Sequence, residues 1–178
     1  MFSKPKDGLL AAAKVVVVLS QIVFIFAMVM LGIGIGAILT VGRTELLADI
    51  ATSSAPAAAY WLIPLAMLTG MALLALGFRF FQELNGIIDS VDDGEPFRPE
   101  NAVRLSRMGW ISIIVHIGVL PIAGLSLWLA PYADKVGQDV DVGAGVDVSG
   151  VLLTLILFIL ARVFRRGAEM RADLEGTV

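Results

Sequence analysis

Four long stretches of the chain carry no charged residue, and they constrain the fold more than any other feature of the sequence. Three of them, residues 15–42, 50–78 and 108–133, contain 28, 29 and 26 residues. Each exceeds the roughly 20 residues that a helix needs to cross the hydrocarbon core of a bilayer. The fourth, residues 148–161, contains 14 residues before Arg162. Because Val163 and Phe164 continue its apolar face and the arginine side chain can extend to the headgroups, we predict a short fourth span. The alternative is an interfacial or re-entrant helix.

The composition agrees with a chain that is largely surrounded by lipid. Of its 178 residues, 58% are hydrophobic and 16% are charged, against roughly 45–50% and 25% in an average globular protein. A chain of this length cannot bury so much apolar surface in a core of its own. We predict an all-α fold: a single integral membrane domain over residues 1–178, with a four-helix transmembrane bundle whose spans cover about 15–39, 57–79, 108–131 and 149–166. The first span is too long for a signal peptide and is expected to be retained.

The lysine and arginine residues predict the orientation of the spans, because cytoplasmic loops carry an excess of them. With the N-terminus in the cytoplasm, 11 of the 13 basic residues lie on the cytoplasmic side, and only Arg43 and Lys135 lie outside. Both termini are then cytoplasmic. The aromatic residues that we expect at the two membrane interfaces are Tyr60, Trp61, Trp128 and Tyr132 outside and Trp110 inside.

Two connections between the spans have recognisable patterns. In residues 80–107, apolar residues recur at helical spacing up to Val91, the segment 92–96 ends that helix, and Pro99 suits the first turn of the next. We therefore predict a cytoplasmic helical hairpin between spans two and three, and a cytoplasmic tail over residues 167–178. Valine and aspartate alternate on both sides of a glycine turn in residues 140–148, which predicts a short β-hairpin; the alternative is a solvated acidic loop. The first outer loop, residues 43–56, has no distinctive pattern.

His116 is the only histidine and the only ionisable residue deep within a predicted span. It follows Arg107 by nine residues, which places it about 13 Å into the membrane. Such residues usually face the bundle interior and are functional candidates. The simplest interpretation is a neutral histidine that is hydrogen-bonded to another helix; a role in ligand binding or proton sensing is the alternative. Pro121 removes a backbone hydrogen bond and predicts a kink, either static or acting as a hinge.

Small residues recur at a spacing of four in the first two spans, as Gly32 and Gly36 and as Ala66 and Gly70. Such pairs let helix backbones approach closely. They predict helix packing within the chain or between copies in a homo-oligomer.

The residue inventory argues against an enzyme. The chain has no cysteine, no pair of carboxylates within a span and no base beside a nucleophile. A calcium-loop-like pattern begins at Asp89, but Val91 stands where an oxygen ligand belongs, and Pro96 and Pro99 disturb the rest. The net charge of −3 gives no reason to expect direct nucleic-acid binding. We expect no catalytic residue, no cofactor and no metal site.

Charges of both signs gather on the predicted cytoplasmic side. The acidic residues Asp92, Asp93 and Glu95 can pair with a set of arginines near the C-terminus, although exposed ion pairs are individually weak. The basic set, Arg162, Arg165, Arg166 and Arg171, can also bind anionic lipid headgroups. The candidates for binding a protein partner are Asp92, Asp93, Glu95, Phe97, Arg165 and Arg166. Phe97 either anchors the partner or packs back against the bundle.

Two segments resemble a known family. The segment GEPFRPENAVRLSRMGW, residues 94–110, resembles the signature G-x-P-F-x-x-E-N-x-x-R-L-x-x-x-G-W of the YoaS-like domain-of-unknown-function family. The tail ARVFRRG, residues 161–167, and the ending DLEGTV resemble the usual end of its members. The resemblance covers essentially the whole chain and implies a small four-span protein of a bacterial inner (plasma) membrane. Because many members are encoded beside a small cytoplasmic helix-turn-helix regulator, it also implies a protein that binds or restrains such a regulator.

Three functions are compatible with these observations. The leading hypothesis is a non-enzymatic inner-membrane regulator or adaptor that binds a cytoplasmic protein through the hairpin and the tail. The alternative is a structural accessory subunit of a larger membrane complex. A third is a small transporter or channel, which would require an oligomer because the spans contain few polar residues. Membrane lipid is a partner in every case.

Overall fold

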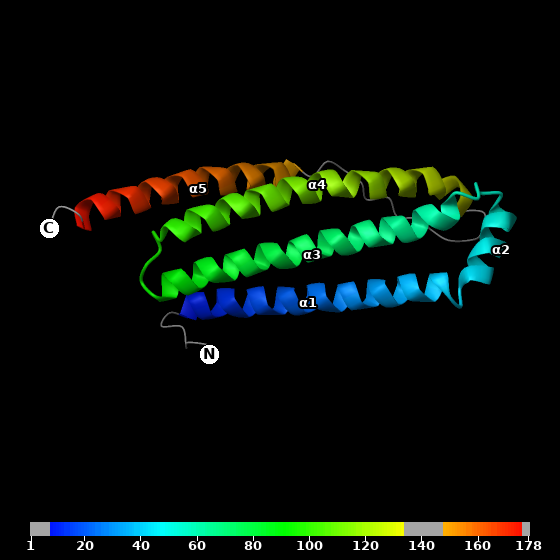
Figure 1. Cartoon of the computed structure of the whole chain (residues 1–178), viewed down its shortest axis with the longest axis horizontal. Helices are drawn as coiled ribbons and strands as arrows, with labels where there is room; N and C mark the ends of the chain where they lie inside the picture. The colour runs from blue at the N-terminus through cyan, green and yellow to red at the C-terminus, as the bar shows by residue number, and fades with distance from the viewer. Residues whose placement is uncertain (1–7, 134–147, 176–178) are drawn as a thin grey trace. The chain divides into compact units, whose positions relative to one another are not determined.

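The computed structural model describes residues 8–133 and 148–175, all of them helical or in the short connections between helices. Figure 1 shows the five helices, which are α1 (Gly8–Leu39), α2 (Arg43–Ser53), α3 (Ala59–Asp92), α4 (Pro99–Ala133) and α5 (Val148–Glu175). No strand occurs in these two described stretches, which confirms the all-α class for them. The predicted β-hairpin lies outside the described residues except for Val148, which begins α5.

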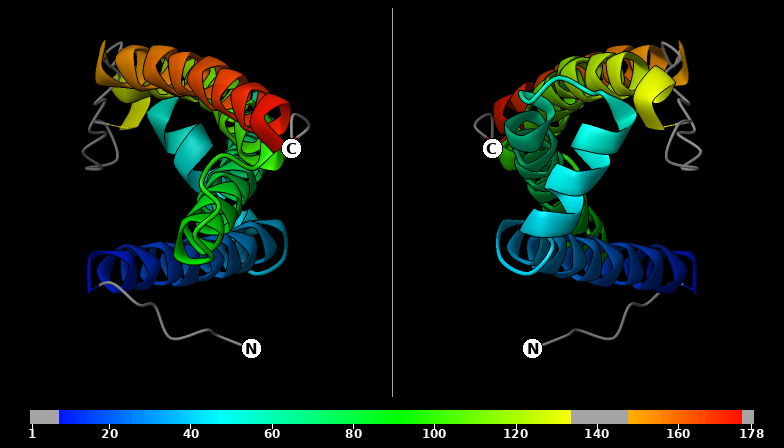
Figure 2. Two further views of the ribbon diagram at one scale, coloured as in Figure 1. Left: turned by 90° about the vertical axis from the view of Figure 1, so that its left-hand side faces the viewer. Right: turned by 90° about the vertical axis from the view of Figure 1, so that its right-hand side faces the viewer.

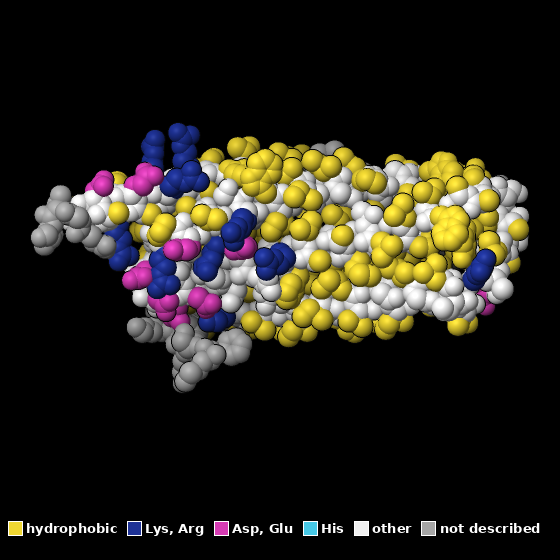
Figure 3. Space-filling model, in the orientation of Figure 1, with side chains coloured by type: hydrophobic (Ala, Val, Ile, Leu, Met, Phe, Trp, Pro, Cys, Tyr) yellow, Lys and Arg dark blue, Asp and Glu magenta, His cyan; other side chains and the backbone are white. Residues whose placement is uncertain are grey.

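Four helices, α1, α3, α4 and α5, are long and apolar enough to cross a membrane, as the charge-free stretches predict. Their outward surfaces carry large apolar side chains: Val23 and Phe26 of α1 are each 64% exposed, and Ile159 of α5 is 57% exposed. Figure 3 shows hydrophobic side chains over most of the length of these helices. Water would penalise such surfaces, whereas lipid would not. The structure is therefore consistent with a multi-pass membrane protein.

The short helix α2 occupies the segment for which the sequence showed no distinctive pattern. Leu46, Leu47 and Ile50 lie at helical spacing, and Glu45 stands in the first turn, where the helix dipole favours an acid. Ser54 ends the helix in the left-handed conformation, with φ of 58°. In the right-hand view of Figure 2, α2 spans the distance between the end of α1 and the start of α3.

The chain divides into two compact units, and each unit takes parts of several helices. The first contains the described residues within Met1–Phe24, Leu76–Ile114 and Asp147–Val178. The second contains those within Ile25–Ala75 and Val115–Val146. The two units are described separately below.

In the first unit, the core forms where α4 packs against α5. Leu105 and Met108 of α4 and Leu157 and Ala161 of α5 are each at most 5% exposed. The partly buried side chains packed against this core are Phe80, Leu84, Ile87 and Phe164.

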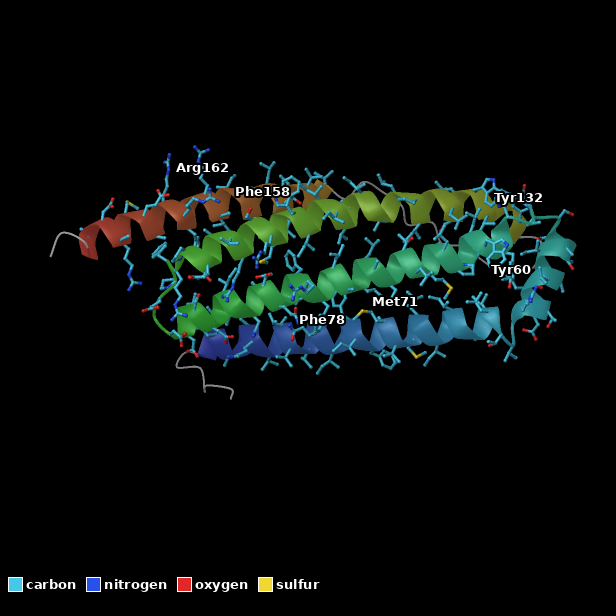
Figure 4. The ribbon with its side chains drawn as sticks, viewed as in Figure 1. Tyr60, Met71, Phe78, Tyr132, Phe158 and Arg162 are labelled. Carbon is cyan, nitrogen blue, oxygen red and sulfur yellow. The ribbon has the colours of Figure 1, made fainter. Side chains whose placement is uncertain are left out.

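Gly109 lets α4 and α5 approach closely in the first unit. A Cβ atom on Gly109 would lie 2.9 Å from Cζ of Phe158, whose ring also meets the Trp110 ring edge-on at 5.8 Å. Figure 4 labels Phe158 on α5. One turn further along, the hydroxyls of Ser112 and Thr154 lie 2.7 Å apart and share a hydrogen bond.

The same unit joins α1 to α3. Nζ of Lys14 lies 2.6 Å from Oδ1 of Asp89, and this lysine side chain is only 13% exposed. The rings of Phe24 and Phe81 pack with their centroids 5.7 Å apart. An ion pair and an aromatic pair therefore fix α1 beside α3.

In the second unit, glycines again mark the places where helices meet. A Cβ atom on Gly34 would lie 3.1 Å from Cε of Met67, and one on Gly70 would lie 3.6 Å from Cδ2 of Leu31. Of the predicted pair Gly32 and Gly36, only the first lies at a contact between helices. A Cβ atom on Gly32 would lie 3.9 Å from Cε of Met71, whereas a Cβ atom on Gly36 would have nothing within 4 Å. Met71 is labelled on α3 in Figure 4, together with Tyr60 and Tyr132 of the same unit.

We predict that Gly109→Leu destabilises the protein, because the new side chain would occupy the volume of the Phe158 ring. Overpacking of this kind costs about 1–3 kcal/mol, and thermal unfolding in detergent measures it. Gly124→Leu is the matched control, because Gly124 lies on the same helix, is exposed and has nothing within 4 Å of its Cβ position. Equal melting temperatures for the two variants would contradict the close α4–α5 contact.

Candidate functional site

The connection between α3 and α4 forms one wall of the candidate site. As the sequence predicts, α3 ends at Asp92 and α4 begins at Pro99. The chain reverses at Gly94, whose φ of +80° belongs to the left-handed region that glycine adopts without strain. The backbone N–H of Glu95 then donates to the carbonyl of Ser90 at 2.9 Å. The turn is thus closed by a hydrogen bond back to the last turn of α3.

Asn101 holds this turn together from the start of α4. Its side chain is 0% exposed, and Nδ2 donates to Oγ of Ser90 at 2.5 Å and to the carbonyl of Pro96 at 2.9 Å. Ser90 in turn donates to the carbonyl of Ile87 at 2.7 Å. Sequence reasoning did not single out Asn101. The available signal was an amide side chain in the first turn of a helix that follows a tight turn.

The acidic side chains of the turn pair with arginines of the same chain. Nε of Arg98 lies 2.6 Å from Oε2 of Glu95, and its Nη2 lies 3.3 Å from Oδ2 of Asp93. From α5, Nη2 of Arg171 lies 3.9 Å from Oε1 of Glu95. The hydrogen bond and the positive charge of Arg98, with a smaller contribution from Arg171, hold the pKa of Glu95 below its ordinary value.

Phe97 packs on α5. Its ring centroid lies 5.5 Å from that of Phe164, and its Cδ1 lies 2.6 Å from the position that a Cβ on Gly167 would occupy. The side chain is nevertheless 43% exposed. Of the two roles considered for Phe97, the structure shows the contact with the chain itself, and the exposed part of the ring lines a groove.

The groove has a volume of about 620 Å³ and lies between the turn, the start of α4 and the end of α5. Its apolar lining comes from Phe97, Pro99, Ala102, Val103, Ala168 and Ala172. Its charged lining comes from Glu95, Arg98, Arg165, Glu169 and Arg171. Figure 3 shows acidic and basic side chains gathered over these parts of the first unit. The lining therefore combines apolar side chains with side chains of both charges.

The structure brings together some of the predicted partner-binding residues and not others. Glu95, Phe97 and Arg165 line the groove, whereas Asp92, Asp93 and Arg166 do not. Asp92 has an interaction partner within the structure. The residues that sequence reasoning missed include Val103, Ala168, Glu169 and Ala172. In the sequence, Ala168 and Ala172 are small residues four positions apart, a spacing that indicates the close approach of another segment to α5.

A second set of charged residues lies within the hairpin and does not line the groove. Glu83 of α3 is 13% exposed, and its carboxylate faces Nη1 of Arg107 at 3.4 Å and Nε of Arg104 at 3.9 Å. The Arg104 guanidinium lies against Gly86, where a Cβ would be 2.6 Å from Cζ. These pairs join α3 to α4 across the hairpin.

The candidate residues of the predicted spans lie in the second unit. His116 is half-buried and has an interaction partner in the structure. Helix α4 continues through Pro121, which is exposed and borders a depression of about 130 Å³ together with Ala66 and Thr69. Among the described residues, no group of three or more His, Cys, Asp or Glu side chains could hold a metal ion.

The comparison with family models identifies the chain. The model described as "Protein of unknown function (DUF2975)" matches residues 46–178. The chain belongs to this family. Neither a search of curated proteins nor a search of solved structures gives a match. The DUF2975 match includes the turn, α4 and α5, so every residue that lines the groove lies in the family region. The expected membership of a domain-of-unknown-function family is confirmed, and the function has to be inferred from the site.

We predict that Asn101→Ala destabilises the turn between α3 and α4. The substitution takes a donor away from the buried hydroxyl of Ser90 and from the half-buried carbonyl of Pro96. A buried group that loses its partner costs about 1–3 kcal/mol. Thermal unfolding in detergent, with hydrogen exchange of the amides in residues 92–99, measures the effect. Ser106→Ala is the control, because Ser106 is a half-buried polar residue of the same helix. Unchanged exchange in Asn101→Ala would show that the side chain does not hold the turn.

We predict that Glu95 titrates below an ordinary glutamate, whose pKa is 4.5. Because the folded-state pKa is lowered, the ion pair stabilises the fold above the ordinary pKa, and this stabilisation is lost as the pH falls through the folded value. Carboxyl ¹³C NMR, with the Glu95 signal assigned from Glu95→Gln, follows the titration. Arg98→Gln should raise the pKa of Glu95 more than Arg171→Gln does. The opposite order would mean that Arg171 is the principal partner.

Proposed function

We propose that this protein is a non-enzymatic membrane adaptor or regulator that binds a cytoplasmic protein in the groove between the start of α4 and the end of α5. The groove itself is the observation that carries the proposal. Its lining combines apolar side chains, among them Phe97, Val103 and Ala172, with charged side chains. An apolar centre with a polar rim is the usual anatomy of a protein–protein interface.

The proposal places the groove in the cytoplasm of a bacterium, with both termini on the same side. Its support is the distribution of basic residues. Apart from Arg43 and Lys135, every lysine and arginine belongs to a segment of the first unit, which contains the groove. The positive-inside tendency favours the cytoplasm for that unit.

The charges of the groove indicate what the partner presents to it. Arg98 and Arg171 already neutralise Glu95, and Arg98 also neutralises Asp93. A partner that bound through the acidic residues alone would have to displace these arginines. We therefore propose that the partner inserts an apolar segment over Val103 and Ala172 and pairs with the remaining charges of the lining. A small helix-turn-helix regulator is the partner that the family resemblance implies.

The hydroxyl groups in the spans favour this function over a transporter or channel. Thr69 and Ser126 donate to carbonyls of their own helices, at 2.9 and 3.0 Å. Ser112 and Thr154 bond to each other. These hydroxyls are therefore already bonded within the chain, and a polar path would need other groups. An accessory subunit of a larger complex stays the alternative, and it would dock through the exposed apolar faces of the long helices.

We predict that Val103→Trp and Ala172→Trp each abolish capture of the partner, because a large ring would fill the groove. Both positions are exposed, so the substitutions do not disturb the core. The measurement is in-membrane cross-linking from the segments that line the groove, followed by purification in mild detergent and mass spectrometry. Met170→Trp is the control, since Met170 is 63% exposed on the same helix and does not line the groove.

Each outcome separates the candidates. One soluble protein that is lost with Val103→Trp and Ala172→Trp but kept with Met170→Trp would support the adaptor. Recovery of other membrane proteins, unaffected by all three substitutions, would favour the accessory subunit. Capture of the soluble protein by all three variants would exclude the groove as its binding site.

A further inference from the structure

Three arginines of α5 form no ion pair with any residue that the structure describes. Among the other basic residues described, Lys14, Arg98, Arg104 and Arg107 each face a carboxylate of the chain within 4 Å, whereas Arg79 donates to Gln82 and Arg43 lies over the ring of Tyr60. Arg171 at the end of α5 faces Glu95. Arg162, Arg165 and Arg166 are exposed, and no described residue forms an ion pair with them. Figure 4 shows Arg162 pointing away from α4.

Two of these arginines continue an apolar face of α5. Leu155, Ile159, Arg162 and Arg166 follow one another at spacings of four, three and four residues, so they share one face of the helix. Leu155 is 54% exposed and Ile159 is 57% exposed. Leu157 and Ala161, on the opposite side of the helix, are buried in the core. The outward face thus changes from apolar to basic within one helical turn.

Trp110 indicates where a membrane interface would lie relative to this change. Phe158 is in edge-on contact with Trp110, which is 59% exposed, and exposed tryptophan is typical of the membrane interface. Arg162 follows Phe158 by one turn, a rise of about 6 Å. With the interface at Trp110, the two arginines would lie just beyond it, and the two apolar side chains would lie inside it.

We infer that this face of α5 binds one anionic phospholipid. Leu155 and Ile159 contact an acyl chain, and the guanidinium groups of Arg162 and Arg166 bind the phosphate. Guanidinium groups donate two parallel hydrogen bonds to phosphate oxygens and keep their charge at every relevant pH. The nearest carboxylate further along the helix, Glu169, lines the groove, as does Arg165. The lipid site is consequently separate from the proposed partner site, because neither Arg162 nor Arg166 lines the groove.

The test compares Arg162→Gln/Arg166→Gln with the wild type. Both proteins are purified from the same membranes in mild detergent, and the phospholipids that remain bound are quantified by mass spectrometry. Melting temperatures are then measured with added short-chain phosphatidylglycerol, with phosphatidylcholine of the same chain length and with inorganic phosphate. Arg79→Gln/Arg107→Gln is the control: it removes the same charge from exposed arginines of α3 and α4.

We expect the wild type and the control to retain anionic phospholipid and to be stabilised by phosphatidylglycerol alone. The double variant of α5 should bind it about 30-fold more weakly, from the usual contribution of two arginines near a membrane surface. Equal retention by all three proteins would overturn the proposal. An equal loss in the control would overturn it too, because general charge attraction would then explain the binding. Stabilisation of the wild type by inorganic phosphate to the same extent would show an anion site and not a lipid site.

Discussion

The first unit depends on how tightly α3 is joined to α4. Six residues, 93–98, connect a helix of 34 residues to one of 35, and the polar groups of so short a turn have to be satisfied locally. Asn101 does this with a single side chain, because its two donors reach both the end of α3 and the turn itself. With the turn fixed, Phe97 is directed at α5 and Arg98 at the two acids. The groove exists because these contacts hold its wall in place.

The family-like signature of residues 94–110 has a structural explanation. Gly94 supplies the left-handed backbone, Asn101 closes the turn, and Arg104 covers Gly86 of α3. Gly109 and Trp110 make the contact with Phe158 on α5. Each of these residues shapes the hairpin or attaches α5 to it. The signature therefore builds the surface that contains the groove, which is what the proposed binding function requires.

The sequence predicts the long helices well, because in a bilayer each segment has to make its backbone hydrogen bonds within itself. A run of 26–29 residues without charge can satisfy its backbone in lipid only as a helix, and glycine and proline mark the turn at residues 94–99. Helix α2 was missed because 11 residues with three large apolar side chains give only a weak periodic signal. The groove could not be predicted, since it forms from residues 95–103 and 165–172, which are far apart in the chain. The partner that α5 provides for Glu95 could not be predicted for the same reason. Four arginines of α5 were available, and of these the fold brings only Arg171 to Glu95.

Helix α5 connects the two proposals. Its 28 residues exceed the roughly 20 that a span requires, so about two turns extend beyond the hydrocarbon core. Because successive residues of a helix point in different directions, these turns present one side, with Ala168 and Ala172, to the groove. Arg162 and Arg166 lie outside the groove, on the face that continues from Ile159. A lipid held by these two arginines would fix the position of α5 relative to the membrane surface, and Gly167 contacts Phe97 one residue after Arg166. Such a lipid would connect the membrane surface to the wall of the groove through a single turn of α5.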